Sequence, residues 1–559
     1  MANTQPPVPA SGCRAGQIYN ISIESPIGDT VGFTVFEPAQ LCAGQTYPLV
    51  LQAPGFGDQR TQTLSAPVPS STGGLLVGNN LSELVAANYG VISFDQRGMG
   101  GGTSGQIRSM DPDYEGKDYL PIMDWAQAKL PWLAFGPTLD GKDPHEPIMG
   151  SIGGSYGGMY QFMLLNIDPR HRLRAIVPNI TPSNLNFALY PGGAIKSIWD
   201  YFLFGDGSGL AGNGTTRSQY DPFLDQSFAN GFATNSEDSY SHDFFGYHSA
   251  DYFCNGLPIA TNGGAGTAPQ HPPTTQMPIV NAMVWIGVRD TLFNFNNGYH
   301  NYSCLQRAGG DVRLLSYQAG HNSELAPGTD VGVTEDPGAI LFLPSGDLDD
   351  SRCGSTLSED VAQLAWFNQY LKGQSGAASI IPKQPCISLA EGDAITVPVV
   401  PTFTSGPAEK EFDVGTITLV AGAAPDVPTT ATLYTAGANG DVELGIPHAQ
   451  IYVSGVAGVA LSSPIVYIGL AVKHASNPAV WDLVDNNVLP VRGTGYFDID
   501  MIGGGARLQP GDQLAFVAYG SQDQYVTDGN VSLPEPAVVP VVITGKVFIP
   551  DMGPMASNI

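Results

Sequence analysis

The chain has 559 residues, too many for a single hydrophobic core, so we expect two or three domains. Charged residues make up only 13%, and 51 acidic against 23 basic side chains give a formal net charge of -28. Such an acidic balance argues against nucleic acid as a partner, and without an apolar run of helix-spanning length no segment is expected to cross a membrane.

The six cysteines are even in number and show no C-x-x-C spacing, which disfavours a zinc site. Neighbours along the chain suggest the pairs Cys13–Cys42, Cys254–Cys304 and Cys353–Cys386, although spacing alone leaves other pairings open. Disulfides would indicate an oxidising compartment. The first residues lack the regions of a signal peptide. The chain is then cytoplasmic or, as we favour, a mature secreted or periplasmic form.

Strands are predicted at 17–23 and 30–37 from alternating residues, and at 47–53 from a nearly all-apolar run. A helix at 81–87 and a buried strand at 90–94 follow.

Further along, the pattern predicts a helix at 119–130, a strand at 148–152, a helix at 159–167 and a strand at 173–178. Strands thus alternate with helices from residue 47 onward. This alternation is typical of the α/β class, with a mainly parallel sheet covered by helices on both faces.

The segment Gly153-Gly-Ser-Tyr-Gly157 is a G-x-S-x-G nucleophile elbow between a predicted strand and a predicted helix. The turn is so sharp that side chains two positions either side of the serine would clash, and glycine removes that clash. Ser155 is therefore expected to lie exposed above the strand end. The alternative is a glycine-rich turn with a chance serine.

Residues 179–278 carry many aromatic side chains but no strand pattern. We expect this segment to be an inserted, mostly helical cap on an α/β-hydrolase core. Most of its aromatic residues would form the cap's own core, and a minority would line an apolar pocket above Ser155. The hydrolase core would then consist of residues 1–178 and 279–381.

The sheet resumes with strands predicted at 279–287 and 312–317 around a helix at 297–308. A helix at 357–371 closes this part, with Thr356 and Glu359 as a capping box.

From residue 382 to 559, short runs rich in Val and Thr alternate with turn signals. They predict a separate all-β domain, a sandwich or jelly roll.

A serine nucleophile needs a histidine base and an acid that orients it, in the chain order Ser, Asp, His for this architecture. Asp290 follows the predicted strand 279–287, and His321 follows the strand 312–317. We therefore predict the triad Ser155, Asp290 and His321. Asp95 also ends a strand, but its place before the elbow favours a structural role, such as pairing with Arg97.

The oxyanion hole is expected to use two backbone N–H groups, from Tyr156 after the nucleophile and from Phe56 in the loop after the strand 47–53. This chemistry needs no cofactor and no metal. The acidic loops 206–209 and 347–350 resemble calcium loops only superficially, because the full ligand spacing is missing.

Several segments together resemble the X-Pro dipeptidyl-peptidase and cocaine-esterase family of α/β-hydrolases. They are 95–100, 103–105, 153–158, 287–293 and 320–321. The resemblance implies a hydrolase core, an inserted cap and a C-terminal jelly roll, with Ser155, Asp290 and His321 as the triad. Cocaine esterases place a tyrosine hydroxyl in the oxyanion hole where this chain has Phe56, so here the donor would be a main-chain N–H.

We therefore expect a secreted serine hydrolase that cleaves a small-molecule ester or amide through an acyl-enzyme. The first alternative is an X-Pro dipeptidyl-peptidase, which needs an acidic anchor for the free amine of its peptide substrate. Candidate anchors in the cap are Asp200, Asp221, Asp225, Glu237, Asp238 and Asp243. The second alternative is a non-catalytic protein that binds a carbohydrate or polymer. The sequence leaves the oligomeric state open.

Overall fold

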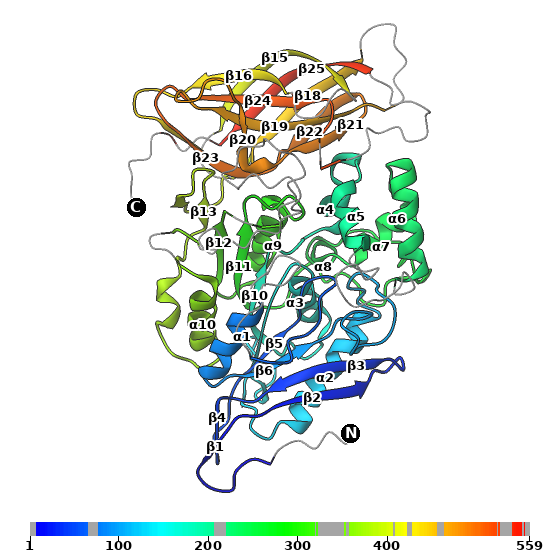
Figure 1. The fold of residues 1–559 in the computed structure, drawn as a ribbon, viewed down its shortest axis with the longest axis vertical. Coiled ribbons are helices and arrows are strands. Elements are labelled where there is room, and N and C mark those ends of the chain that lie inside the picture. The colour runs from blue at the N-terminus through cyan, green and yellow to red at the C-terminus, as the bar shows by residue number, and fades with distance from the viewer. Residues whose placement is uncertain are drawn as a thin grey trace.

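The computed structural model describes residues 7–64, 77–205, 220–318, 320–321, 351–353, 357–405, 409–421, 428–455, 463–522, 524–525, 539–550 and 553. A large sheet with its helices lies below the C-terminal sheets in this view, and the first strands of the chain lie at the end farthest from those sheets (Figure 1). Helices α4 to α8 lie beside the large sheet and below the C-terminal sheets in this view.

The large sheet has ten strands in the order β14-β13-β12-β11-β10-β9-β5-β6-β3-β2. Their bounds are β2 (Ile18–Glu24), β3 (Thr30–Phe36), β5 (Leu49–Gln52), β6 (Gly90–Phe94), β9 (Met149–Gly154), β10 (Leu173–Asn179), β11 (Asn281–Gly287), β12 (Val312–Tyr317), β13 (Cys386–Ser388) and β14 (Ala394–Thr396). Neighbours from β6 through β13 run parallel, whereas β2, β3 and β14 pair antiparallel. The predicted mainly parallel sheet is confirmed. We expected the hydrolase core to end at residue 381, but β13 and β14, which follow that residue, belong to the large sheet.

Helices cover both faces of the sheet. Successive residues of a strand point to opposite faces, so two neighbouring residues of β5 show which helices pack on each face. In β5, Leu51 packs in a core with α2 (Glu115–Lys129), α3 (Tyr156–Ile167) and α9 (Phe295–Ala308). Its neighbour Val50 packs in a second core, formed with α1 (Val77–Ala86) and α10 (Glu359–Tyr370). The α/β class predicted from the sequence is therefore confirmed.

No strand of the described chain lies between β10 and β11. Among its described residues this interval contains five α-helices: α4 (Leu185–Leu189), α5 (Ser197–Gly205), α6 (Pro222–Thr234), α7 (Ser239–Tyr247) and α8 (Ala250–Asn255). Asp221 and Asp238 begin α6 and α7, where their side chains accept the N–H of Phe223 and Ser241. We call this segment the helical insert.

The C-terminal strands form two antiparallel sheets and a strand pair. The four-stranded sheet contains β15 (Lys410–Ala421), β18 (His448–Gly455), β22 (Gly495–Asp500) and β25 (Val539–Ile549). The five-stranded sheet contains β16 (Thr429–Thr435), β19 (Ile465–Lys473), β20 (Asp482–Leu483), β21 (Leu489–Arg492) and β24 (Gln513–Tyr519). The pair is β17 (Asp441–Gly445) with β23 (Gly504–Leu508). Ile451 of the first sheet and Phe516 of the second share one core, so the predicted all-β character is confirmed.

The C-terminal part contacts the rest of the chain at several points. Asn487 donates from its amide to the carbonyl oxygen of Val288 at 3.1 Å. Ile198 in α5 donates its N–H to the carbonyl oxygen of Gln524 at 3.4 Å. The C-terminal part therefore holds both the loop after β11 and the helical insert.

The three predicted cysteine pairs are confirmed as disulfides, Cys13–Cys42, Cys254–Cys304 and Cys353–Cys386. The first joins the paired strands β1 (Cys13–Ala15) and β4 (Gln40–Cys42). The second ties α8 of the helical insert to α9. Helix α10 begins at Ser358, which makes no side-chain capping bond; the expected capping residue Thr356 lies outside the described residues.

The remaining short elements are the strand pair β7 (Phe135–Gly136) with β8 (Glu146–Pro147), and the 3-10 turns η1 (Pro191–Gly193), η4 (Ala377–Ile380) and η5 (Val484–Asn486). Every helix of the described chain is too short or too polar to span a membrane.

Candidate active site

Ser155 lies in a sharp turn between the end of β9 and the start of α3. Its backbone has φ 56° and ψ -128°, a conformation that is costly for a residue with a side chain. A Cβ on Gly153 would collide with the carbonyl of Gly157, and a Cβ on Gly157 would collide with the carbonyl of Ala53. The two glycines are thus needed where the elbow pattern predicts them.

The serine backbone is fixed to the neighbouring strand. Its N–H donates to the carbonyl oxygen of Asn179 at 2.9 Å, and its own carbonyl oxygen accepts the Thr181 hydroxyl at 3.3 Å. Ser155 was expected to lie exposed, but the residue is only 7% exposed, because the site also lies under side chains of the helical insert.

Asp290 and His321 form a direct hydrogen bond, from Nδ1 of the imidazole to Oδ2 of the carboxylate at 2.6 Å. The other carboxylate oxygen accepts the N–H groups of Leu292 at 2.9 Å and Phe293 at 2.6 Å. Because an ionised carboxylate only accepts, Nδ1 carries the proton, and Nε2 of the neutral ring is then an acceptor. This is the tautomer that a general base needs.

His321 is held by its backbone as well as by Asp290. Its carbonyl oxygen accepts the Thr291 N–H at 3.0 Å and the Thr291 hydroxyl at 3.1 Å. A Cβ on Gly320 would come within 2.6 Å of the Asp290 Cβ, so only glycine allows this close approach. The imidazole also meets the rings of Trp199 and Phe293 edge-on, at 5.9 Å and 5.1 Å between centroids.

Ser155, Asp290 and His321 all follow parallel strands of one sheet, β9, β11 and β12, and so lie at the same sheet edge. Nε2 of His321 is buried without a hydrogen-bond partner among the described residues. The structure joins Asp290 to His321, and within the described chain no hydrogen bond joins His321 to the Ser155 hydroxyl. In unliganded sites such bonds are often long and shorten only with substrate.

Phe56 follows β5 in a loop against the start of α3, since the carbonyls of Ala53 and Pro54 both face Gly157. Its ring meets the Tyr156 ring edge-on at 5.2 Å and stacks at 6.4 Å on the Tyr220 ring from the helical insert. The N–H of Tyr156, as the first residue of α3, has no acceptor within the helix. The two residues expected to form the oxyanion hole thus lie side by side.

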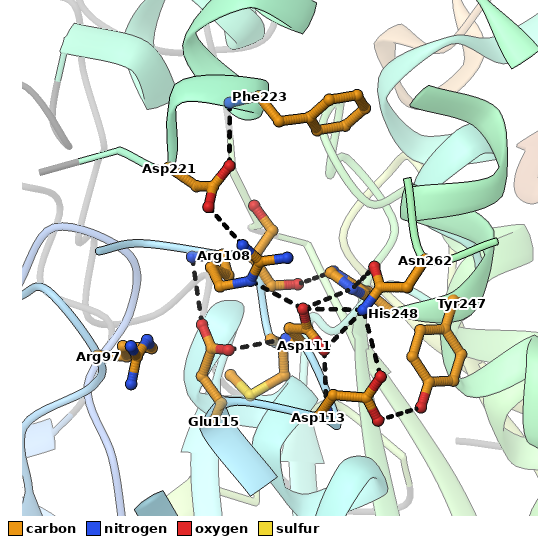
Figure 2. A network of polar contacts seen from close by, with 12 residues as sticks. Arg97, Arg108, Asp111, Asp113, Glu115, Asp221, Phe223, Tyr247, His248 and Asn262 are labelled. Carbon is orange, nitrogen blue, oxygen red and sulfur yellow. Dashed lines mark hydrogen bonds and ion pairs between the residues drawn. The ribbon is translucent and has the colours of Figure 1, made fainter. Parts of the chain in front are cut away.

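A buried polar network joins the loop before α2 to the helical insert (Figure 2). Asp111 accepts from Nε of Arg108 at 2.9 Å and from Nδ2 of Asn262 at 3.0 Å, and lies 3.6 Å from Nε2 of His248. Arg108 also pairs with Asp221 at the start of α6. The helical insert is therefore fastened to the core by charged groups.

The same network reaches the elbow through Tyr156. The Met110 N–H donates to Oη of Tyr156 at 2.8 Å, and Oη lies 3.5 Å from Oε1 of Glu115. Burial, reinforced by Asp111, raises the pKa of Glu115 to about 8. Burial alone would also raise the pKa of Asp111, but His248 and Arg108 bring it well below its usual range.

The expected pairing of Asp95 with Arg97 is wrong. Asp95 accepts the N–H of Arg60 at 2.7 Å and pairs with its guanidinium. Arg97 instead pairs with Asp118 at 2.8 Å and Asp29 at 2.7 Å. Each side chain instead meets a partner from a distant segment of the chain, Arg60 for Asp95 and Asp118 for Arg97.

Two further residues of the helical insert lie near the site. Trp199 is one of the aromatic residues of which a minority was expected to face Ser155, whereas Lys196 was not predicted. Trp199 contacts His321 and donates from Nε1 to the Thr291 hydroxyl at 3.0 Å. Lys196 is 2% exposed and donates from Nζ to the carbonyl oxygen of Leu292 at 3.1 Å. A lysine inside an apolar, aromatic run of a lysine-poor chain was the available signal.

Among the described residues, no cluster of three or more His, Cys, Asp or Glu side chains could hold a metal ion. The loops 206–209 and 347–350 lie outside the described residues.

The fold is that of an α/β-hydrolase. The model of the X-Pro dipeptidyl-peptidase (S15) family matches residues 28–323, more than half of the chain, and the chain belongs to this family of hydrolases. No match was found among curated protein sequences.

Solved structures with the same fold cover nearly the whole chain. An aminopeptidase from the marine sediment archaeon Thaumarchaeota archaeon aligns with a TM-score of 0.61 and 13% identity, over 98% of both chains. A CocE/NonD family hydrolase from Staphylococcus aureus aligns at 0.58 and 13%, over 97% of both. An α-amino acid ester hydrolase aligns at 0.58 and 14%, over 98% of both. At such identities the likeness extends to the fold alone.

Proposed function

We propose that this protein is a serine hydrolase that cleaves an ester or amide bond through an acyl-enzyme, with Ser155, Asp290 and His321 as its triad. The observation that carries the proposal is the buried Asp290–His321 hydrogen bond, which leaves Nε2 of the imidazole without a partner in the described chain. The strained Ser155 at the end of a strand in the same sheet supplies the nucleophile.

In this mechanism Ser155 Oγ attacks the substrate carbonyl while His321 takes its proton at Nε2. Asp290 stabilises the imidazolium that forms. The oxyanion is stabilised by the N–H groups of Tyr156, at the positive end of α3, and of Phe56. His321 then protonates the leaving group, and water, activated by the same imidazole, releases the acyl group from Ser155.

We further propose that residues 179–278 act as a cap, residues 382–559 as a jelly roll, and that the protein works outside the cytoplasm. Trp199 against His321 and Tyr220 against Phe56 support the first role, because both rings come from the helical insert. The disulfides support an oxidising compartment.

A fluorophosphonate probe tests the mechanism. The wild-type protein should be labelled at Ser155, and the Ser155→Ala variant should lose both labelling and turnover. Absence of labelling in folded wild-type protein would exclude the proposed hydrolase and leave the alternative of a carbohydrate- or polymer-binding protein.

The second candidate is an X-Pro dipeptidyl-peptidase, and one observation favours it. Three of the six acidic residues expected as amine anchors, Asp200, Glu237 and Asp238, line a cavity of about 220 Å³ in the helical insert. At least four of the six already have partners. Asp221 pairs with Arg108, and Asp243 accepts two backbone N–H groups. Asp238 accepts the Ser241 N–H, and Glu237 pairs with His242. Turnover of a p-nitrophenyl ester compared with an Ala-Pro anilide separates the candidates.

A further inference from the structure

Lys196 is a buried cation beside the loop that carries Asp290. It lies just before α5 in the helical insert, and its side chain is almost fully enclosed, with 2% of the residue exposed. Lysine is rarely buried to this extent unless a charge compensates it, because removing an ammonium from water costs several kcal/mol. The acidic residues that compensate this charge therefore show which part of the active site Lys196 can influence.

The Lys196 ammonium is hydrogen-bonded to the loop that carries Asp290. Nζ of Lys196 donates to the carbonyl oxygen of Leu292 at 3.1 Å, and the Leu292 N–H donates to Oδ1 of Asp290 at 2.9 Å. One residue, Leu292, therefore connects the ammonium to the carboxylate that orients His321.

Lys196 also interacts with Asp290 through space. Burial lowers the pKa of Lys196 to about 8, and the charges of Asp290 and Asp200 oppose that shift. Asp200 in α5 is itself buried, which raises its pKa, and it faces Lys196 and Glu237. The acidic groups that interact with this ammonium are thus Asp290 from the core and Asp200 from the helical insert. Glu237 interacts with Asp200.

A positive charge at this place has two consequences for the Asp290–His321 pair. It stabilises the Asp290 carboxylate, and it opposes a second positive charge on the imidazole.

We propose that Lys196 is a positioning residue of the active site, which fixes the Asp290 loop through the Leu292 carbonyl and extends the action of His321 as a base toward acidic pH. This role rests on the proposed serine-hydrolase mechanism. It also gives the helical insert a part in the chemistry, since Lys196 and Trp199 approach the Asp290–His321 pair from the same segment.

The test is the pH profile of kcat/KM for a p-nitrophenyl ester, with Lys196→Met, Lys196→Gln and Lys196→Arg compared with wild type. The Met and Gln variants should move the acidic limb to higher pH by about one unit, the usual effect of one nearby charge. The Arg variant keeps the charge and should retain the wild-type limb. Lys546→Met, which removes a half-exposed lysine paired with Glu411, is the matched control and should shift nothing.

A merely structural lysine would lower kcat and the melting temperature in the Met and Gln variants without moving the limb, and that result overturns the proposal. If Lys196→Met does not fold, Lys196→Gln against Lys196→Arg decides alone. Fluorophosphonate labelling of wild-type protein is measured first. No labelling removes the serine mechanism and this role together, whereas labelling with an unmoved limb removes only the role of Lys196.

Discussion

At the scale of single residues, the elbow depends on two glycines, Gly153 and Gly157, whose neighbours leave no space for a side chain. Gly157 faces the carbonyls of Ala53 and Pro54, in the loop that carries Phe56. A methyl group there would push the start of α3 away from this loop and so separate the Tyr156 and Phe56 N–H groups.

Gly157→Ala is therefore expected to cost about 1–3 kcal/mol of stability, the usual effect of overpacking. It should also lower kcat and leave KM nearly unchanged. Denaturant unfolding and ester turnover measure the two effects. Gly437→Ala, at a position with open space around the Cβ, is the matched control. Wild-type turnover in Gly157→Ala would contradict the role given to this contact.

Residue-scale features differ in how far the sequence predicts them. The elbow is a local feature, so five consecutive residues are enough to predict it. Asp290 and His321 could be predicted as its partners because each follows a predicted strand. The pairing of Asp95 with Arg60 and the burial of Lys196 depend on distant segments meeting, which no local pattern encodes.

At the scale of elements, a cluster of buried carboxyl groups lies where the large sheet meets the C-terminal strands. Glu443 on β17 and Asp485 in η5 are almost fully buried, and each has one oxygen without a partner among the described residues. Burial raises the pKa of Asp485 to about 6 and that of nearby Glu391 to about 7, and raises the pKa of Glu443 strongly.

These raised pKa values predict that the junction is most stable in acid. Unfolded carboxyl groups ionise near pH 4, whereas the folded ones keep their protons, so stability falls as the pH rises from about 4 through the folded pKa values of about 6 and about 7. Glu443→Gln removes one such ionisation and should stabilise the protein at pH 8 by about 1–3 kcal/mol, but have little effect at pH 5.

Thermal unfolding of Glu443→Gln at the two pH values measures this, with Glu411→Gln on the exposed face of β15 as the control. An equal shift of the midpoint at both pH values would refute the linkage to ionisation.

Predicted and observed elements agree best where burial alone defines them. The strand 90–94 is found at the predicted residues, because a central parallel strand is apolar throughout. The strands β13 and β14 were missed as members of the large sheet, since both are short and β13 pairs with β12, which lies far upstream in the chain. Strand β14 joins the sheet through β13.

At the scale of the whole molecule, Cys254–Cys304 connects the helical insert to the core across 50 residues. Its removal in Cys254→Ala/Cys304→Ala should cost about 2–4 kcal/mol, the usual effect of opening such a loop, and should also lower turnover because the insert carries Trp199 and Lys196. The Cys13–Cys42 pair, in the N-terminal strands at the opposite end from the C-terminal sheets, is the control (Figure 1). Its removal should reduce stability but not kcat; equal turnover in both variants would contradict the coupling.

The contact between Asn487 and the carbonyl of Val288 has a consequence for biosynthesis. Val288 lies two residues before Asp290, and Asn487 is translated about two hundred residues later, which takes roughly 10–40 s at ordinary elongation rates. The sheet can assemble earlier, but the loop that orients His321 receives this support only when the C-terminal strands have emerged. The nascent protein should thus reach full activity only after the C-terminal strands have been made.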